Sequence, residues 1–191
     1  DSFTKKELQE LFSPTDEEIK FVHLHSADLR TGLPLLSLLK SFQHLGYFPK
    51  WNEIPQEIPQ YLASALGYLF SWKDFPDYDT SSARSRHMWQ IRSFLKINAV
   101  NKSTYQCMEE TALLSAQTKE HLADIINVMI EQLVQKRFEL PGFSRFIRVA
   151  RAARIEVNES CYQGISNQLS DKEKEQLDQW LEKKTEAGGS W

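Results

Sequence analysis

Three times along the chain a hydroxyl side chain stands three residues before a glutamate, and this spacing marks the first turn of an α-helix. The pairs are Thr4 with Glu7, Thr15 with Glu18 and Ser170 with Glu173. In such a pair the hydroxyl accepts a hydrogen bond from the third helical residue, whose carboxylate reaches back to the cap. Glycine and proline number only seven each in 191 residues, and the alternation of β-branched residues that marks strands is rare. The sequence therefore predicts an all-α fold.

Helical periodicity and its interruptions divide the chain into segments. The stretch 98–101 is polar and unpatterned between two periodic segments, and Pro141-Gly142 makes a second, sharper break. We expect two helical lobes, one at 1–98 and one at 99–186, and a flexible tail at 187–191. The helices are expected at 4–12, 15–24, 33–46, 56–67, 82–96, 103–115, 119–138, 143–167 and 171–184.

Composition excludes several classes of protein. With 41% apolar and 26% charged residues and a net charge of -3, the chain can bury a substantial core and is too apolar for intrinsic disorder. Its apolar stretches are shorter than a membrane span, and its N-terminus does not resemble a signal peptide. Two cysteines, Cys107 and Cys161, are too few for a disulfide framework, which favours a reducing compartment such as the bacterial cytoplasm.

The nearly neutral net charge conceals a strong segregation of basic residues. Between Thr80 and Met108 the chain has five basic residues and no acidic one: Arg84, Arg86, Arg92, Lys96 and Lys102. Between Leu133 and Ile155 Glu139 stands alone against six bases: Lys136, Arg137, Arg145, Arg148, Arg151 and Arg154. Two acid-poor basic blocks in a weakly acidic chain are typical of a protein that binds a polyanion.

Helical spacing predicts which of these residues face outward. In 82–96 the apolar stripe contains Met88, Ile91, Phe94 and Leu95, which leaves Arg86, Trp89, Ser93 and Lys96 opposite and Gln90 and Arg92 on the flanks. In the long basic helix 143–167 the buried stripe is expected to contain Phe146, Ala150, Ala153, Val157 and Cys161. Arg148 then faces outward with Arg145 and Arg151 beside it, while Arg154 falls near the apolar side and is expected to snorkel or to pair with a carboxylate.

No catalytic, metal-binding or cofactor-binding constellation is recognisable in the sequence. His23 and His25 are two residues apart and point away from each other on a helix, so they cannot share a metal ion. Gly32, Gly46, Gly67, Gly142 and Gly164 are scattered one at a time, and no glycine-rich phosphate-binding loop is recognisable. Neither cysteine has a base or a second thiol at motif spacing. We therefore expect a non-enzymatic chain without cofactor or metal.

Several stretches carry a family resemblance that covers nearly the whole chain. They are LFSPTDEEIKFVHLHSADLRTGLPLLSLLKSFQHLGYFP, EIPQEIPQYLASALG, ARSRHMWQIRSFL and the segment from LSAQTKEHL to YQGI, with RFELPGFS at 137–144 as its most specific part. Together they resemble the N-terminal region of replicative transposases of the Tn-three type, the class II bacterial transposases.

The resemblance implies that the chain binds the terminal inverted repeats of a transposon as double-stranded DNA. Cleavage and joining of strands would belong to a downstream ribonuclease-H-like domain with acidic metal ligands, so the chain would be a non-catalytic recognition fragment. Expected partners are the repeat DNA, the rest of the transposase chain and, in the full-length protein, a second copy. The expected location is the bacterial cytoplasm, on the nucleoid when the chain is bound to DNA, with no membrane contact.

Helix-turn-helix-like bundles are the expected form of the two lobes. Arg86 and Gln90 are the candidate base readers, since both can make paired hydrogen bonds to base edges. The candidate phosphate contacts are Arg84, Arg92, Lys96, Lys102, Lys136, Arg137, Arg145, Arg148 and Arg151. An alternative function is a helical module that dimerises the transposase or binds another protein, in which case the basic blocks are solvated surface.

Overall fold

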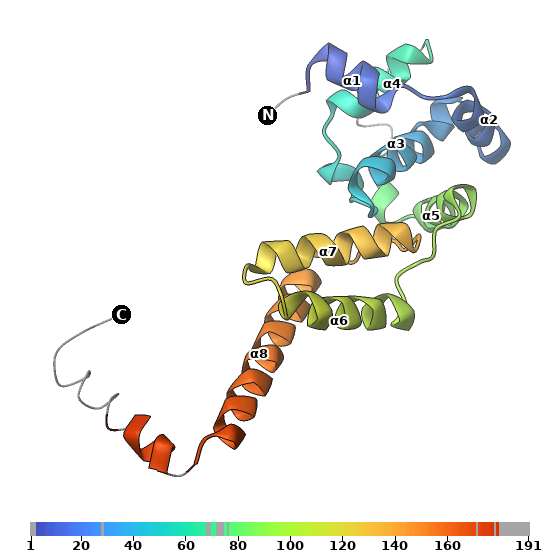
Figure 1. Cartoon of the computed structure of the whole chain (residues 1–191). Coiled ribbons are helices and arrows are strands. Elements are labelled where there is room, and N and C mark those ends of the chain that lie inside the picture. The colour runs from blue at the N-terminus through green and yellow to red at the C-terminus, as the bar shows by residue number, and fades with distance from the viewer. Residues whose placement is uncertain are drawn as a thin grey trace. The chain divides into compact units, whose positions relative to one another are not determined.

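The computed structural model confirms an all-α fold. It describes residues 3–27, 29–67, 70, 71, 75, 77–170, 172–177 and 179. Within these residues no strand forms, and the only β-type pairing is an isolated bridge between Asn98 and Phe138. The helices, drawn in Figure 1, are α1 (Lys5–Phe12), α2 (Asp16–His25), α3 (Leu29–Leu45), α4 (Glu57–Ala65), α5 (Ser82–Leu95), α6 (Lys102–Ala116), α7 (Leu122–Gln135) and α8 (Phe143–Gln168), with 3-10 turns η1 (Trp51–Glu53) and η3 (Tyr78–Thr80).

The capping signals form as the sequence predicts. Thr15 N–H donates to Glu18 Oε2 (2.7 Å), and Glu18 N–H donates to Thr15 Oγ1 (3.3 Å). Thr4 and Glu7 make the same reciprocal pair at the start of α1. Ser170 and Glu173 also pair, at the start of the helical residues 172–177. The rest of the helix expected at 171–184 and the tail expected at 187–191 lie outside the described residues, apart from residue 179.

Two helices differ from their expected bounds by three residues or more. Helix α3 begins at Leu29 rather than at residue 33. Gly32 and Pro34 usually break helices, which predicts a later start, but both lie inside α3. Gly32 permits a close approach of α2, since a Cβ atom there would lie 2.3 Å from Val22 Cγ1. Helix α7 ends at Gln135 rather than at residue 138, because Arg137 turns left-handed (φ 57°) and Phe138 N–H donates to Leu133 O (2.9 Å).

The chain divides into two compact units. Unit 1 contains residues 1–105 and 131–142, and unit 2 contains residues 106–130 and 143–191. The core of unit 1 is built on α3, which packs against α2, α4 and α5. The fully buried leucines of α3 are Leu33, Leu35, Leu36, Leu38 and Leu39. The lobe boundaries expected from the sequence stay a prediction.

The segment 131–142 is tied to the rest of unit 1 by backbone hydrogen bonds. Asn98 N–H donates to Arg137 O (2.8 Å) and Glu139 N–H donates to Asn98 O (2.9 Å). Leu140 N–H donates to Gly46 O (2.8 Å). Gly46 has a positive φ of 73°, and a Cβ atom there would lie 2.7 Å from Leu140 Cδ1. Glycine therefore fits this junction because the conformation and the close contact both disfavour a side chain.

In unit 2, α8 is anchored to the end of α6 only along its first half. Phe146, Ala150 and Ala153 are buried, and Arg154 donates to the carbonyl oxygens of Ala116 (2.9 Å) and Lys119 (3.3 Å). The expected burial of Cys161 is wrong, because every residue from 158 to 168 is exposed. The apolar stripe of α8 therefore functions as a core face only as far as the half-buried Val157.

Candidate nucleic-acid interface

Helix α5 exposes one narrow face, which carries one of its three arginines, Arg86. The Ser81 hydroxyl caps the helix by accepting from Arg84 N–H (3.2 Å). His87, Gln90 and Ile91 are buried, so the opposite side of the helix is exposed. We call this side, together with Lys96 directly after the helix, the α5 face. It consists of Ser82, Ser85, Arg86, Trp89, Ser93 and Lys96, all of them exposed.

The outward position expected for Gln90 is wrong. Its side chain is only 7% exposed, and its Nε2 donates to His25 Nδ1 on α2 (3.0 Å). Its Oε1 atom is buried without a hydrogen-bond partner. Helical spacing does not predict the burial of Gln90, because glutamine is a polar residue. Position 90 nevertheless adjoins the buried Ile91, and a glutamine can occupy the edge of a core when a polar partner faces it. Gln90 therefore connects α5 to α2 rather than pointing into a groove.

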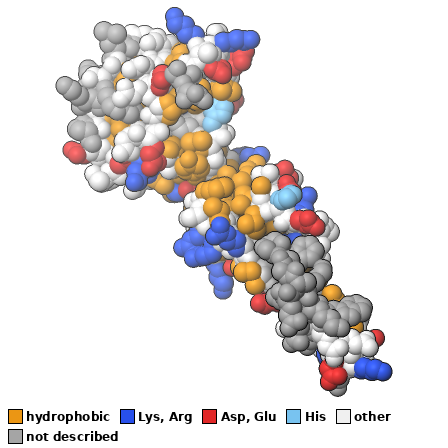
Figure 2. Space-filling model, turned by 90° about the vertical axis from the view of Figure 1, so that its left-hand side faces the viewer, with side chains coloured by type: hydrophobic (Ala, Val, Ile, Leu, Met, Phe, Trp, Pro, Cys, Tyr) orange, Lys and Arg blue, Asp and Glu red, His pale blue; other side chains and the backbone are white. Residues whose placement is uncertain are grey.

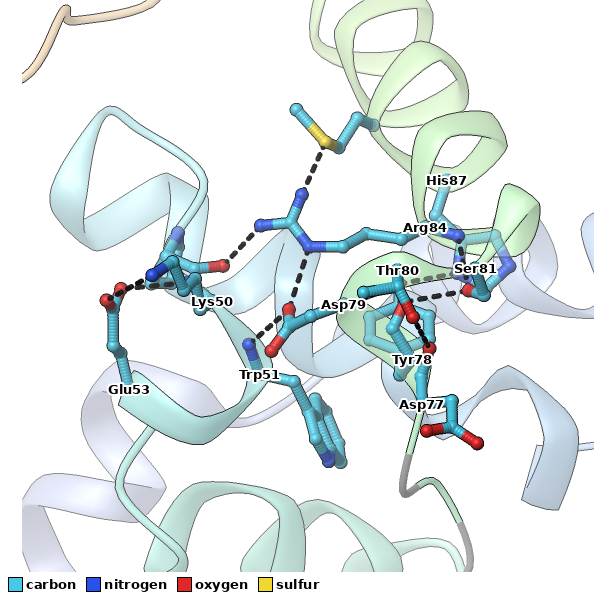
Figure 3. A network of polar contacts seen from close by, with 12 residues as sticks. Lys50, Trp51, Glu53, Asp77, Tyr78, Asp79, Thr80, Ser81, Arg84 and His87 are labelled. Atoms are coloured by element: carbon cyan, nitrogen blue, oxygen red, sulfur yellow. Dashed lines mark hydrogen bonds and ion pairs between the residues drawn. The ribbon is translucent and has the colours of Figure 1, made fainter.

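Arg84 is held in a network of polar contacts, shown in Figure 3. Its Nε donates to Asp79 Oδ1 (3.0 Å) and its Nη2 donates to Pro49 O (2.7 Å). Asp79 Oδ1 also accepts from Trp51 N–H (2.7 Å). With a side chain only 13% exposed, Arg84 fixes the start of α5 against η1 and η3. Such an arginine has few free donors for an external phosphate.

Arg92 is likewise engaged inside unit 1. Its Nη2 lies 2.8 Å from Glu139 Oε2, and its guanidinium carbon lies 5.0 Å from the centre of the Phe48 ring. The side chains of Arg92 and Glu139 are 23% and 12% exposed. The one acidic residue of the second basic block therefore neutralises a base of the first block and joins 131–142 to α5.

Two basic residues at the Asn98–Phe138 bridge adopt a conformation that side chains disfavour. Lys96 (φ 54°) ends α5 and Arg137 (φ 57°) follows α7, and they are the only described non-glycine residues with positive φ. Both are exposed, and Arg137 Nη1 lies 3.5 Å from Leu95 O. Lys102 and Lys136, also in unit 1, are exposed as well. These four residues are the bridge cations.

In unit 2 the basic residues follow the first half of α8. Arg145, Arg148 and Arg151 are exposed as expected. Arg148 lines a hollow of about 440 Å³ between α6 and α8, together with Glu109 and Glu156. Arg154 differs from its neighbours, because it pairs with backbone carbonyls at the end of α6 rather than with a carboxylate. Figure 2 shows Lys and Arg side chains at the surface in several separate places, with Asp and Glu side chains among them.

The buried polar groups of unit 1 are structural in character. His87 is 4% exposed, its Nδ1 lies 2.8 Å from the Tyr78 hydroxyl, and burial lowers the pKa of His87 to about 4. Among the described residues no group of three or more His, Cys, Asp or Glu side chains could hold a metal ion. The helices within the described ranges include none long and apolar enough to cross a membrane.

These observations define an all-α protein with exposed basic surfaces on both of its units. Residues 1–153 match the family described as "Domain of unknown function (DUF4158)", and the chain belongs to that family. The chain is also 26% identical, over 142 residues, to the protein named "Transposase for transposon Tn501" from Pseudomonas aeruginosa. The match covers 73% of this chain but only 14% of that transposase. The chain is thus similar to one part of a much longer transposase.

Proposed function

We propose that the chain is the DNA-recognition part of a replicative transposase and that it binds the terminal inverted repeats of a transposon. The observation that carries the proposal is the set of basic residues of the two acid-poor blocks that are exposed in the two units. They are Arg86, Lys96, Lys102, Lys136 and Arg137 in unit 1 and Arg145, Arg148 and Arg151 in unit 2. The similarity to a transposase supports the choice of transposon DNA as the ligand.

Within this proposal the two units divide the work. Arg86 on the α5 face reads a base edge, because a guanidinium can donate two hydrogen bonds to guanine. The bridge cations and the α8 arginines contact phosphates and set the register of the protein on the duplex. Arg84, Arg92 and Gln90 support α5 from inside and make no direct contact with DNA. Strand cleavage and joining are assigned to the rest of the transposase.

A second candidate function has its own observation. Ile155, Tyr162 and Ile165 of α8 are 58%, 72% and 58% exposed, and the intervals of seven and three residues place them on one side of the helix. Such a stripe suits contact with another protein, including a second copy of the transposase in its full-length form. A protein-interaction module of this kind would function in addition to DNA binding or instead of it. In either case we expect the protein in the bacterial cytoplasm.

The experiment that tests the proposal compares two duplexes by fluorescence anisotropy. One is the terminal repeat of the element that encodes the chain, and the other is a scrambled duplex of the same composition. We expect clear preference for the repeat, and Arg86→Ala should cost about 1–3 kcal/mol on the repeat and little on the scrambled duplex. Equal and weak binding to both duplexes would favour the protein-interaction module.

A further inference from the structure

Trp89 is the most unusual side chain of the α5 face. Tryptophan is highly buried on average, yet Trp89 is 66% exposed. At 100° per residue it lies at the middle of the exposed face, between Arg86 and Ser93 on one side and Ser85 on the other. The ring therefore lies where a molecule that binds the α5 face would contact it.

The neighbours of Trp89 leave its ring uncovered. Ser85 and Ser93, one turn before and one turn after it, are small, and the segment 82–96 has no acidic residue. The 14 residues of α5 form a rod about 21 Å long, and the DNA major groove, about 12 Å wide, admits an α-helix. Small serines allow the helix backbone to approach the bases, and the absence of carboxylates avoids repulsion from phosphates.

We infer that Trp89 is a specificity-determining residue that contacts the 5-methyl group of a thymine in the major groove of the bound DNA. This inference rests on the proposed function. Among the base-edge groups that distinguish base pairs in the major groove, the thymine methyl is the apolar one, so it is the group an indole ring selects. Because Gln90 is buried, the α5 face has no amide side chain to read adenine directly.

The spacing on α5 places this contact beside a second base contact. Arg86 precedes Trp89 by three residues, so the two side chains are neighbours on the α5 face. A helix that lies in the major groove would therefore present them to base pairs close to each other. The expected recognition element is a guanine close to a thymine.

The test replaces each thymine of the terminal repeat in turn by uracil, which removes the methyl group and keeps the pairing. We expect one such position to lower the affinity of the wild-type chain about fourfold, the value of one buried methyl group. Trp89→Ala should bind the thymine and uracil duplexes equally, and Trp89→Phe should keep part of the difference. Leu24→Ala, at a 79% exposed position of α2 in the same unit, is the matched control and should behave as wild type.

The outcomes separate the inference from the proposed function. Failure of the wild-type chain to prefer the repeat over the scrambled duplex refutes the proposed function itself. Preference for the repeat without any effect of uracil overturns the role of Trp89. A Trp89→Ala chain that still prefers thymine, even with weaker binding on every duplex, also overturns it, because the ring would then act as a wedge or a structural group.

Discussion

Lys96 offers a way to separate the charge of a DNA contact from the stability of the fold. It adopts φ 54° and ψ 49° after α5, where Ile97 N–H donates to Arg92 O (2.9 Å) and closes the helix end. A side chain in this left-handed conformation costs about 1–2 kcal/mol, whereas glycine adopts it readily. Lys96→Ala keeps the strain and Lys96→Gly removes it, but both remove the same positive charge.

The two variants should therefore differ in stability and agree in DNA binding. We expect Lys96→Gly to exceed Lys96→Ala by about 1 kcal/mol in the free energy of unfolding, measured by urea titration with circular dichroism. In anisotropy titrations both should lose the same affinity and lower the salt slope by about 0.9, the value of one phosphate contact. Lys5→Ala, at an exposed position of α1, controls for the loss of a surface charge.

Two results would refute this reasoning. If Lys96→Gly is less stable than Lys96→Ala, residue 96 does not hold the left-handed conformation in solution. If both variants bind the repeat with unchanged affinity and slope, the charge at residue 96 is solvated surface.

Three other substitutions have defined outcomes. Arg148→Ala should weaken binding to the repeat and to the scrambled duplex by a similar factor and lower the salt slope by about one. Arg154→Ala should instead leave the salt slope unchanged and destabilise unit 2 in urea titrations, because Arg154 donates to Ala116 O. Lys40→Met should cost about 3–5 kcal/mol in urea titrations, because it leaves the buried Glu18 carboxylate without its cation at 3.1 Å. Replacing both residues by Met should recover part of that loss, but not the hydrogen bond that the Glu18 carboxylate accepts from Thr15 N–H. Burial lowers the pKa of His87 from 6.5 to about 4, so between these pH values the unfolded chain binds a proton at His87 and the folded chain does not. The free energy of unfolding should therefore fall by up to about 3 kcal/mol between about pH 6.5 and 4. His87→Asn should flatten this part of the plot of stability against pH.

The sequence predicted the helices well where the deciding interactions are local. A capping pair such as Thr15 and Glu18 lies within one turn, so the order of residues contains both partners. The end of α7 was harder to predict, because Arg137 takes a left-handed position at which glycine is usual. No residue type in the sequence marks that turn.

The candidate interface could be predicted only in part, because the state of an arginine depends on distant partners. Arg92 is matched by Glu139, 47 residues away, and no periodicity reveals that pair. One signal was available: an acid that stands alone in a basic block is a natural partner for a buried base. Hydrophobic periodicity identifies only apolar core positions, so it does not reveal the burial of Gln90, whose partner His25 lies on another helix.

The salt dependence of DNA binding by the wild-type chain tests the central claim most directly. The affinity for the terminal repeat is measured by anisotropy at increasing salt concentration, and the logarithm of the binding constant is plotted against the logarithm of the concentration. With about six phosphate contacts from the exposed cations, the account predicts a slope of about -5. An affinity that hardly changes between low and moderate salt would contradict it, because basic surfaces that bind DNA phosphates must release counterions.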